Sequence, residues 1–460
     1  MAQQQDEQTP IISRIKSLTG KKLTYAERYL STTFSRDARN LGASCKLLVL
    51  VLIVAAAMGA AAWAFLTALD LVTDAREASP LFFLLLPAVS LVTAWLYRTR
   101  GLAANRGNNL VIDSAITGRL IHARMAFLTF CCSVATHLAG GSAGREGTAV
   151  QIGGTIASNV SHAAHLGERD HHDLMLSGIS AAFGAVFGTP LAGAFFGMEM
   201  CYVGKLDYSS ALYCLIASFT GNSVARMLGT AHAAHAIAAV PPVTLGSILL
   251  VTGAAIVFGL VARLFSLAIR TVKRFYANRF KNYLIAALTG SLVLLAAFAI
   301  TGGWNYAGLS EWLVGAGFDG ATTPVDAALK LALTALTLGA GFQGGEVTPL
   351  FGIGAALGGW LSVQAGWDPS FLAALGMVGV FGAALNVPIT TIMLGIDLFG
   401  GAASSYLVIV AFVSYLIAGH RGVYPAQRIV TPKRRSLVHE QGETVEEAIT
   451  NQRQQLEDME

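Results

Sequence analysis

The sequence predicts an all-α integral membrane protein built from two related halves. Of its 460 residues, 54% are hydrophobic and only 13% are charged, whereas an average soluble domain carries about 25% charged residues. Several apolar stretches reach the roughly 20 residues that a helix needs to cross a bilayer. Two separate motifs also occur twice in the same order. The low charge excludes an ordinary soluble enzyme, and the repeated motifs divide the chain into two comparable parts.

The apolar stretches fall into two classes. Those predicted to be ordinary membrane-crossing helices are residues 45–69, 80–97, 243–268, 283–301 and 402–418. Shorter pieces, broken by Gly, Pro or Asn, are predicted to be half-helices that meet inside the bilayer: residues 122–139, 146–156, 174–198, 333–341, 347–360 and 372–398. Irregular backbone is tolerated at that depth only where protein covers it or a polar cavity accepts its hydrogen bonds. The interruptions therefore indicate where the functional site lies.

Basic residues predict the orientation of the chain. They are concentrated in residues 1–46, 263–281 and 428–435, and an excess of Lys and Arg marks cytoplasmic segments. We therefore expect solvated loops in these places, with both termini in the cytoplasm. A net charge of +4 is explained by this orientation, so nucleic-acid binding is not expected. The polar start lacks the pattern of a cleaved signal peptide.

The same features predict the domain organisation. We expect a cytoplasmic amino-terminal segment at residues 1–44 and two membrane halves at residues 45–240 and 241–427. A short cytoplasmic tail without a regulatory domain is expected at residues 428–460.

An internal repeat relates the two membrane halves. Residues 183–190 (FGAVFGTP) align with residues 381–388 (FGAALNVP) at a constant offset of 198. Upstream, residues 144–148 (GREGT) align with residues 344–348 (GGEVT) at an offset of 200. Corresponding interrupted segments in two halves are typical of secondary transporters, which bind their substrate near the midplane at the repeat interface. The repeat therefore favours a transporter.

The interruptions carry predicted helix N-termini. Gly-rich or Asn-rich turns precede apolar helical runs at residues 107–109, 144–148, 188–190, 345–349 and 386–388. A helix start presents unpaired N–H groups and the positive end of the helix dipole. Several such starts in a low-dielectric site can bind an anion without a full positive charge, which would hold the ion too tightly to release it. The residues predicted to line this site are Gly107, Asn108, Asn109, Gly147, Thr148, Val347, Thr348 and Tyr424.

Glu146 is the predicted gate and proton carrier. An ionisable residue within a membrane is energetically unfavourable and indicates a function. Its carboxylate would compete with a transported anion for the same N–H groups, so protonation of Glu146 would free the site. The alternative is a structural role, as a helix cap or as the partner of Arg145.

Three other acids and one tyrosine leave alternatives open. Glu346, the repeat counterpart of Glu146, is expected to have a structural or capping role, because a second carboxylate in the pathway would repel an anion. Glu199 and Asp397 end their half-helices and either pass protons towards the cytoplasm or extend to the membrane surface. Tyr424 either donates its hydroxyl to an anion at the inner end of the pore or is a membrane-interface tyrosine.

Other chemistries have weaker signals. The five cysteines form no C-x-x-C pair and no zinc-finger spacing, so no metal site and no cofactor is expected. Residues 140–144 (GGSAG) match a hydrolase elbow around Ser142, but that elbow requires a preceding strand where an apolar helix is predicted. The glycines at residues 352–358 resemble a dinucleotide loop without a surrounding βαβ unit, and close helix packing explains them.

At these residues the sequence resembles the CLC chloride channel and proton/anion antiporter family. The resemblance rests on the GREG motif at residues 144–147, the G-x-V-x-P motif at 345–349, the repeated F-G-x5-P signature and a tyrosine after the last helix. It covers residues from about 45 to 428. The resemblance implies an all-helical fold of two inverted halves, one anion pathway per subunit, a homodimer, and Glu146 as the gating glutamate.

Departures from the family pattern are similar to its fluoride-exporting branch. Residues 107–111 read GNNLV where chloride-handling members usually have GSGIP, GREGP is replaced by GREGT, and G-x-F-x-P is replaced by GEVTP. Fluoride is small and strongly hydrated, so extra amide and hydroxyl donors would help to replace its water. Met200 stands where chloride/proton exchangers usually carry an inner proton-transfer glutamate, one position after Glu199. The inner proton route therefore stays open.

The sequence thus predicts a CLC-type fluoride/proton antiporter of a bacterial inner membrane, in which proton influx drives fluoride out. The nearest alternative is a chloride channel or chloride/proton exchanger of the same family. An intramembrane hydrolase would depend on Ser142, and a sodium-coupled carrier of small organic anions would need a sodium site that the sequence does not offer. Coupling stoichiometry and the dimer surface are not predicted.

Overall fold

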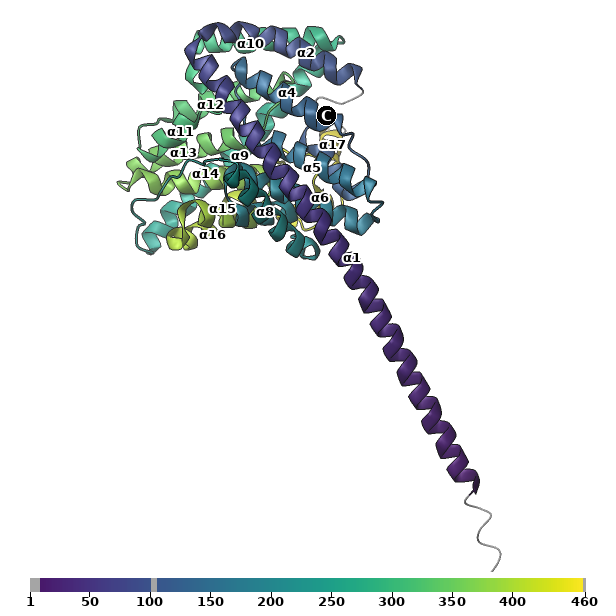
Figure 1. Ribbon diagram of the computed structural model, residues 1–460. Helices are drawn as coiled ribbons and strands as arrows, with labels where there is room; N and C mark the ends of the chain where they lie inside the picture. Colours follow the sequence, from purple (N-terminus) through teal and green to yellow (C-terminus); the bar gives the residue numbers. More distant parts are fainter. Residues whose placement is uncertain (1–8, 101–105, 458–460) are drawn as a thin grey trace, which may run out of the picture. The chain divides into compact units, whose positions relative to one another are not determined.

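The computed structural model describes residues 9–100 and 106–457. The chain divides into two units, Met1–Leu50 and Val51–Glu460, and the first unit contains the beginning of the long helix α1. Figure 1 shows that the described chain is mostly helical. The predicted all-α class is therefore confirmed.

The first half contains eight α-helices within the described residues. In chain order, with the 3-10 turns and the short strand, the elements are α1 (Thr9–Ala78), η1 (Pro80–Leu85), α2 (Leu86–Thr99), α3 (Asn108–Thr117), α4 (Arg124–Leu138), α5 (Glu146–Ala163), α6 (Glu168–Phe187), α7 (Pro190–Glu199), β1 (Tyr202–Val203), η2 (Tyr208–Ser210) and α8 (Ala211–Met227).

The second half has the same succession of helices, followed by a carboxyl-terminal segment. Its elements are α9 (Leu245–Arg279), α10 (Tyr283–Thr301), η3 (Trp304–Tyr306), α11 (Glu311–Phe318), α12 (Pro324–Gly339), α13 (Val347–Gln364), α14 (Pro369–Leu385), α15 (Pro388–Phe399), η4 (Gly401–Ala403), α16 (Ser404–Ala418), β2 (Arg428–Ile429), η5 (Arg435–Glu440) and α17 (Val445–Glu457).

Six helices of the described chain are long and apolar enough to cross a membrane: Gly42–Ala78, Pro80–Thr99, Leu245–Arg279, Tyr283–Thr301, Val347–Gln364 and Gly401–Ala418. Five of these helices correspond to the five stretches predicted as ordinary crossing helices. The sixth, Val347–Gln364, includes residues 347–360, which were predicted as a half-helix. The prediction of a solvated loop at residues 263–281 is wrong, because α9 continues to Arg279. At 35 residues, α9 exceeds the roughly 20 that a bilayer requires, so its charged last turns can extend beyond the lipid while remaining helical.

The other broken apolar pieces also form helices, and two of them each form two helices. Residues 174–198 divide into α6 and α7 at Gly188 (φ 72°), and residues 372–398 divide into α14 and α15 at Asn386 (φ 64°). A left-handed residue ends each helix, and Gly and Asn adopt that conformation most readily. Pro190 and Pro388 then begin the following helices, where the missing N–H of proline would have no helical partner.

The two halves have inverted topology, as two reciprocal contacts demonstrate. Glu199, at the end of α7, accepts a hydrogen bond from the backbone N–H of Thr390 at the start of α15, at 2.8 Å. Asp397, near the end of α15, accepts one from the N–H of Ala192 at the start of α7, at 2.9 Å. These corresponding helices therefore run antiparallel, as inverted repeats require.

The core lies where the half-helices pack. All residues of α14 except its first are buried, and α13 packs along it (Figure 1). Glycines permit the close approach: a Cβ added at Gly354 would lie 2.1 Å from the carbonyl oxygen of Gly376. This supports the interpretation of the residue 352–358 glycines as helix-packing positions rather than a dinucleotide loop.

Candidate functional site

The two repeated turns meet at the centre of the second unit. Gly144 and Gly345 form an antiparallel bridge in which each N–H donates to the carbonyl of the other at 2.7 Å. The contact leaves no room for side chains, because a Cβ added at Gly345 would lie 2.6 Å from the backbone N of Gly147. The bridge brings the starts of α5 and α13 together, one from each half.

The Glu146 side chain extends from the first half of the chain to a helix of the second half. It is the first residue of α5 and its side chain is only 1% exposed. One carboxylate oxygen accepts from the backbone N–H of Thr348 at 3.0 Å and from that of Arg145 at 3.1 Å. The other accepts from the Thr348 hydroxyl. The carboxylate therefore occupies the positive end of α13, the place where a helix N-terminus would bind a free anion.

Arg145 connects this carboxylate to the protein surface. Its Nε lies 3.6 Å from Glu146, and its Nη1 lies 3.0 Å from the half-exposed carboxylate of Glu311. Glu311 lines a cavity of about 970 Å³ together with Asp70, Asp74 and Glu77. Both structural alternatives for Glu146, a helix cap and a partner of Arg145, are thus compatible with its contacts.

Asn108 and Tyr424 form a second part of the site. Gly107, which precedes α3, has a φ of 47°, and this conformation favours glycine. The side-chain amide of Asn108 donates to the hydroxyl oxygen of Tyr424 at 2.9 Å, and both residues are buried. Because Tyr424 accepts this bond, its own proton is free to be donated elsewhere. Asn108 is also close to the turn of the first half, since its Nδ2 would lie 3.1 Å from a Cβ added at Gly147.

Not every residue predicted to line the site directs its polar group there. The Thr148 hydroxyl donates to Ser133 of α4 at 3.0 Å. The Asn109 side-chain oxygen accepts from the backbone N–H of Ala426 at 3.0 Å, which attaches α3 to the loop after α16. Val347 is buried at the first position of α13.

The carboxylates at the α7–α15 crossing have capping contacts. Glu199 accepts from the N–H groups of Ile389 and Thr390 and from the Thr390 hydroxyl, at 2.7–3.1 Å. Asp397 caps α7 in the same way. Sequence reasoning missed this reciprocity, although each acid follows its helix-starting proline by nine residues (199 − 190 and 397 − 388).

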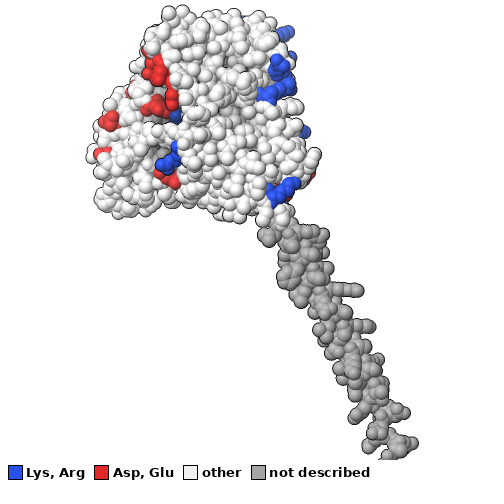
Figure 2. All heavy atoms as spheres, in the orientation of Figure 1, with Lys and Arg blue, Asp and Glu red and all other residues white. Residues whose placement is uncertain are grey.

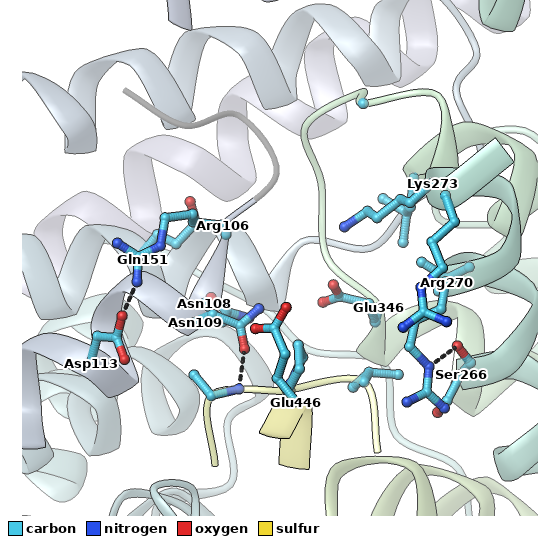
Figure 3. Close-up of a pocket in the computed structure, with 18 of the residues that line it drawn as sticks. Arg106, Asn108, Asn109, Asp113, Gln151, Ser266, Arg270, Lys273, Glu346 and Glu446 are labelled. Atoms are coloured by element: carbon cyan, nitrogen blue, oxygen red, sulfur yellow. Dashed lines mark hydrogen bonds and ion pairs between the residues drawn. The ribbon is translucent and has the colours of Figure 1, made fainter. Parts of the chain in front are cut away.

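A cavity of about 710 Å³, called the inner cavity below, is lined by residues that include Asn108 and Glu346. Figure 3 shows side chains from several elements converging on it. Sequence reasoning missed Gln151, Arg270, Lys273 and Glu446, which line the cavity together with the predicted residues Gly107, Asn108 and Asn109. Oε2 of Glu346 is buried without a hydrogen-bond partner in the described part of the chain.

Other chemistries find little support in the geometry. The Ser142 hydroxyl pairs with that of Thr334 at 3.0 Å, which is not the histidine contact that activates a nucleophile. Among the side chains that the structure describes, no three of His, Cys, Asp or Glu are grouped as metal ligands would be.

Comparison with known proteins identifies the family. The model of the family "Voltage gated chloride channel" matches residues 88–419. A "Chloride/fluoride channel protein" of Pseudomonas syringae pv. tomato is 36% identical over 392 residues, which are 84% of this chain and 86% of that protein. The "H(+)/Cl(-) exchange transporter ClcA" of Vibrio cholerae is 28% identical over 278 residues, 55% of this chain and 58% of that protein.

Solved structures agree with these matches. A crystal structure of a CLC-type fluoride/proton antiporter superimposes with a TM-score of 0.81 at 33% identity, over 84% of this chain and 98% of that one. A slow cyanobacterial Cl⁻/H⁺ antiporter shares the fold with a TM-score of 0.68 at 19% identity, over 81% and 94% of the two chains. The chain therefore belongs to the voltage gated chloride channel (CLC) family, and it is an anion-transporting membrane protein rather than an enzyme.

Proposed function

We propose that the protein is a fluoride/proton antiporter that exports fluoride at the expense of the proton gradient. The observation that carries this proposal is the position of the Glu146 carboxylate on the backbone N–H and the hydroxyl of Thr348. A carboxylate that accepts from these donors occupies the place of a small anion. The names of the Pseudomonas relative and of the 33% identical structure, both of which include fluoride, support the choice of ion.

The exchange follows from the chemistry of these groups. While Glu146 is ionised, its oxygens occupy the donors at the start of α13. Protonation removes its charge and weakens its charge-assisted hydrogen bonds, which are about twice as strong as neutral ones. Fluoride can then take the Thr348 donors, and the neutral side chain leaves with its proton. When Glu146 releases the proton it again competes for the donors, so anion and proton movements are linked through one side chain.

The donors suit a small, strongly hydrated anion. A hydroxyl can rotate towards its acceptor, and the Thr348 hydroxyl adds to the backbone N–H a donor that a hydrocarbon side chain would lack. The free hydroxyl proton of Tyr424, whose oxygen accepts from Asn108, offers a further donor on the inner side. We assign Gly107, Asn109, Gly147 and Val347 to the backbone and walls around these donors, and Thr148 to a supporting contact with Ser133.

We further propose a bacterial inner-membrane location with both termini in the cytoplasm. Figure 2 shows Asp and Glu gathered at the left of the view, with some Lys or Arg beside them, and further Lys and Arg along the right. The inner cavity is lined by Arg106, Arg270, Lys273 and Arg274, and the positive-inside rule assigns such a face to the cytoplasm. The proposed membrane halves are residues 45–240 and 241–427, and we expect a homodimer, as the family resemblance implies.

Halide efflux from liposomes tests the function. Purified protein should release preloaded fluoride much faster than chloride, and fluoride release should drive proton movement in the opposite direction. Equal rates for the two halides with proton movement would instead indicate a chloride/proton exchanger. Rapid anion release without proton movement would indicate a channel.

A further inference from the structure

The carboxyl-terminal segment, residues 428–457, is attached to the membrane core by specific contacts. β1 and β2 pair in parallel, and Val445 and Ile429 are buried in a cluster with Val203 and Tyr415. The Lys433 ammonium is buried and donates to Asn386 at 2.6 Å and to two backbone carbonyls. A buried ammonium with this many partners fixes its segment in place. The segment predicted as a simple tail is therefore part of the folded unit.

The beginning of α17 lies at the mouth of the inner cavity. Thr444 and Glu447 form a capping box: the backbone N–H of Thr444 donates to the Glu447 carboxylate at 2.7 Å, and the N–H of Glu447 donates to the Thr444 hydroxyl at 3.2 Å. These bonds lower the pKa of Glu447 and hold its carboxylate at the cap. The backbone N–H of Glu446 donates to the Pro425 carbonyl at 3.0 Å.

The Glu446 side chain projects into the cavity. Figure 3 shows it rising from the carboxyl-terminal segment, with Asn108 and Asn109 on one side and Glu346 and Lys273 on the other. It is exposed to the cavity, and within the described chain its carboxylate makes no hydrogen bond or ion pair. By contrast, Asp113 in the same cavity is paired with Arg106.

We propose that Glu446 limits the access of anions to the transport site from this face. This inference rests on the proposed anion transport but not on the choice of halide. A carboxylate in this cavity, the vestibule of the transport site, repels anions and offsets the attraction of Arg270, Lys273 and Arg274, because low-dielectric walls focus its field. The carboxyl-terminal segment thereby sets the apparent affinity for anions on the cytoplasmic side. Glu446 acts on the anion before binding and has no part in the proton step.

Equilibrium exchange of tracer fluoride in liposomes tests the proposal. With equal fluoride on both sides, the vestibule of every molecule meets the same concentration, whatever its orientation. Glu446→Gln should lower the half-saturating fluoride concentration by about two- to fivefold at low ionic strength, and Glu446→Lys should lower it further. At about 0.5 M of an impermeant salt the difference should nearly vanish, because the Debye length falls to a few ångströms.

Glu443→Gln is the matched control. Glu443 lies three residues earlier in the same segment, bonds to Asn451 at 2.8 Å and does not line the cavity, so its neutralisation should leave the half-saturating concentration unchanged. An unchanged value in Glu446→Gln, an equal shift in Glu443→Gln, or a shift that persists at high salt would overturn the proposal. If the wild type exchanges chloride but not fluoride, the fluoride assignment fails, and the same comparison made with chloride still tests Glu446.

Discussion

The two pairs of repeat-related acids differ in how they follow the symmetry of the molecule. At the α7–α15 crossing, Glu199 and Asp397 each cap the helix of the opposite half. At the turns before α5 and α13, only Glu146 makes such a contact, because it bonds to Thr348. Its counterpart Glu346 keeps one carboxylate oxygen without a hydrogen-bond partner in the described chain.

The broken symmetry extends to the threonines that follow these acids. The Thr348 hydroxyl bonds to Glu146, whereas the Thr148 hydroxyl bonds to Ser133. The backbone around both turns is nevertheless paired symmetrically through Gly144 and Gly345. We infer that symmetric acids hold the half-helices together, and that the asymmetric pair provides one carboxylate whose partners can be exchanged with an ion.

The largest predicted effect is at the backbone bridge that both turns share. Gly345→Ala should abolish transport and lower the thermal midpoint, because the new Cβ would lie 2.6 Å from the backbone N of Gly147 and the halves would have to separate. Thermal unfolding in detergent and fluoride efflux would measure both effects. Gly253→Ala is the control, since a Cβ there meets nothing within 4 Å and alanine favours a helix by up to about 1 kcal/mol. Wild-type behaviour of Gly345→Ala would show that the bridge is not required.

The next largest effect should distinguish the two threonines. Thr348→Val should slow fluoride transport about ten- to hundredfold, because a hydrogen bond to a charged acceptor contributes about 1.5–3 kcal/mol. Thr148→Val should have a much smaller effect on transport, since its hydroxyl bonds to Ser133. Initial efflux rates measure both variants. Equal losses of efflux rate in the two variants would mean that both threonines contribute equally to transport, which would contradict the proposed asymmetry between the two turns.

The symmetric acids should affect stability more than coupling. Glu199→Gln and Asp397→Asn should each destabilise the protein by about 1–3 kcal/mol, since each leaves N–H donors with a weaker acceptor. Denaturation in detergent measures the loss, and the ratio of protons to fluoride transported should stay at the wild-type value in both variants. A changed ratio in Glu199→Gln alone would support the proton relay that the sequence left open.

The smallest predicted effect, a shift of the pH profile of transport, is expected at Glu311, the surface partner of Arg145. Glu311→Gln leaves Arg145 to pair with Glu146 alone, which should make the gate harder to protonate. Transport should then require a slightly lower pH, by less than about 0.7 units, because an exposed ion pair contributes at most about 1 kcal/mol. Glu77→Gln, in the same cavity but paired with Arg76 at 3.7 Å, should leave the pH profile in place. An equal shift in both variants would indicate a general surface-charge effect instead.

Much of this architecture could be predicted from local sequence. Hydrophobic length predicted the crossing helices, and Gly, Pro and Asn predicted the interruptions, because these residues act through the backbone at their own position. The aligned turns placed Glu146 at a helix start for the same reason.

The parts that sequence reasoning missed depend on contacts between distant segments. The direction of the Thr148 hydroxyl is set by Ser133 on another helix. Glu446 reaches the cavity because β1 and β2 pair across more than two hundred residues (428 − 202 = 226). Arg270 and Lys273 line the cavity because α9 remains helical through a stretch whose charges suggested a loop. No sequence pattern within any one of these segments predicts such contacts.

The most direct test compares Glu146→Gln with Glu346→Gln in fluoride efflux measured as a function of pH. A glutamine at residue 146 resembles the protonated gate at every pH, so fluoride should move without driving protons and the rate should lose its pH dependence. Glu346→Gln should retain coupled proton movement. Proton-coupled fluoride transport with a wild-type pH profile in Glu146→Gln would contradict the central claim that this carboxylate and the anion exchange places on Thr348.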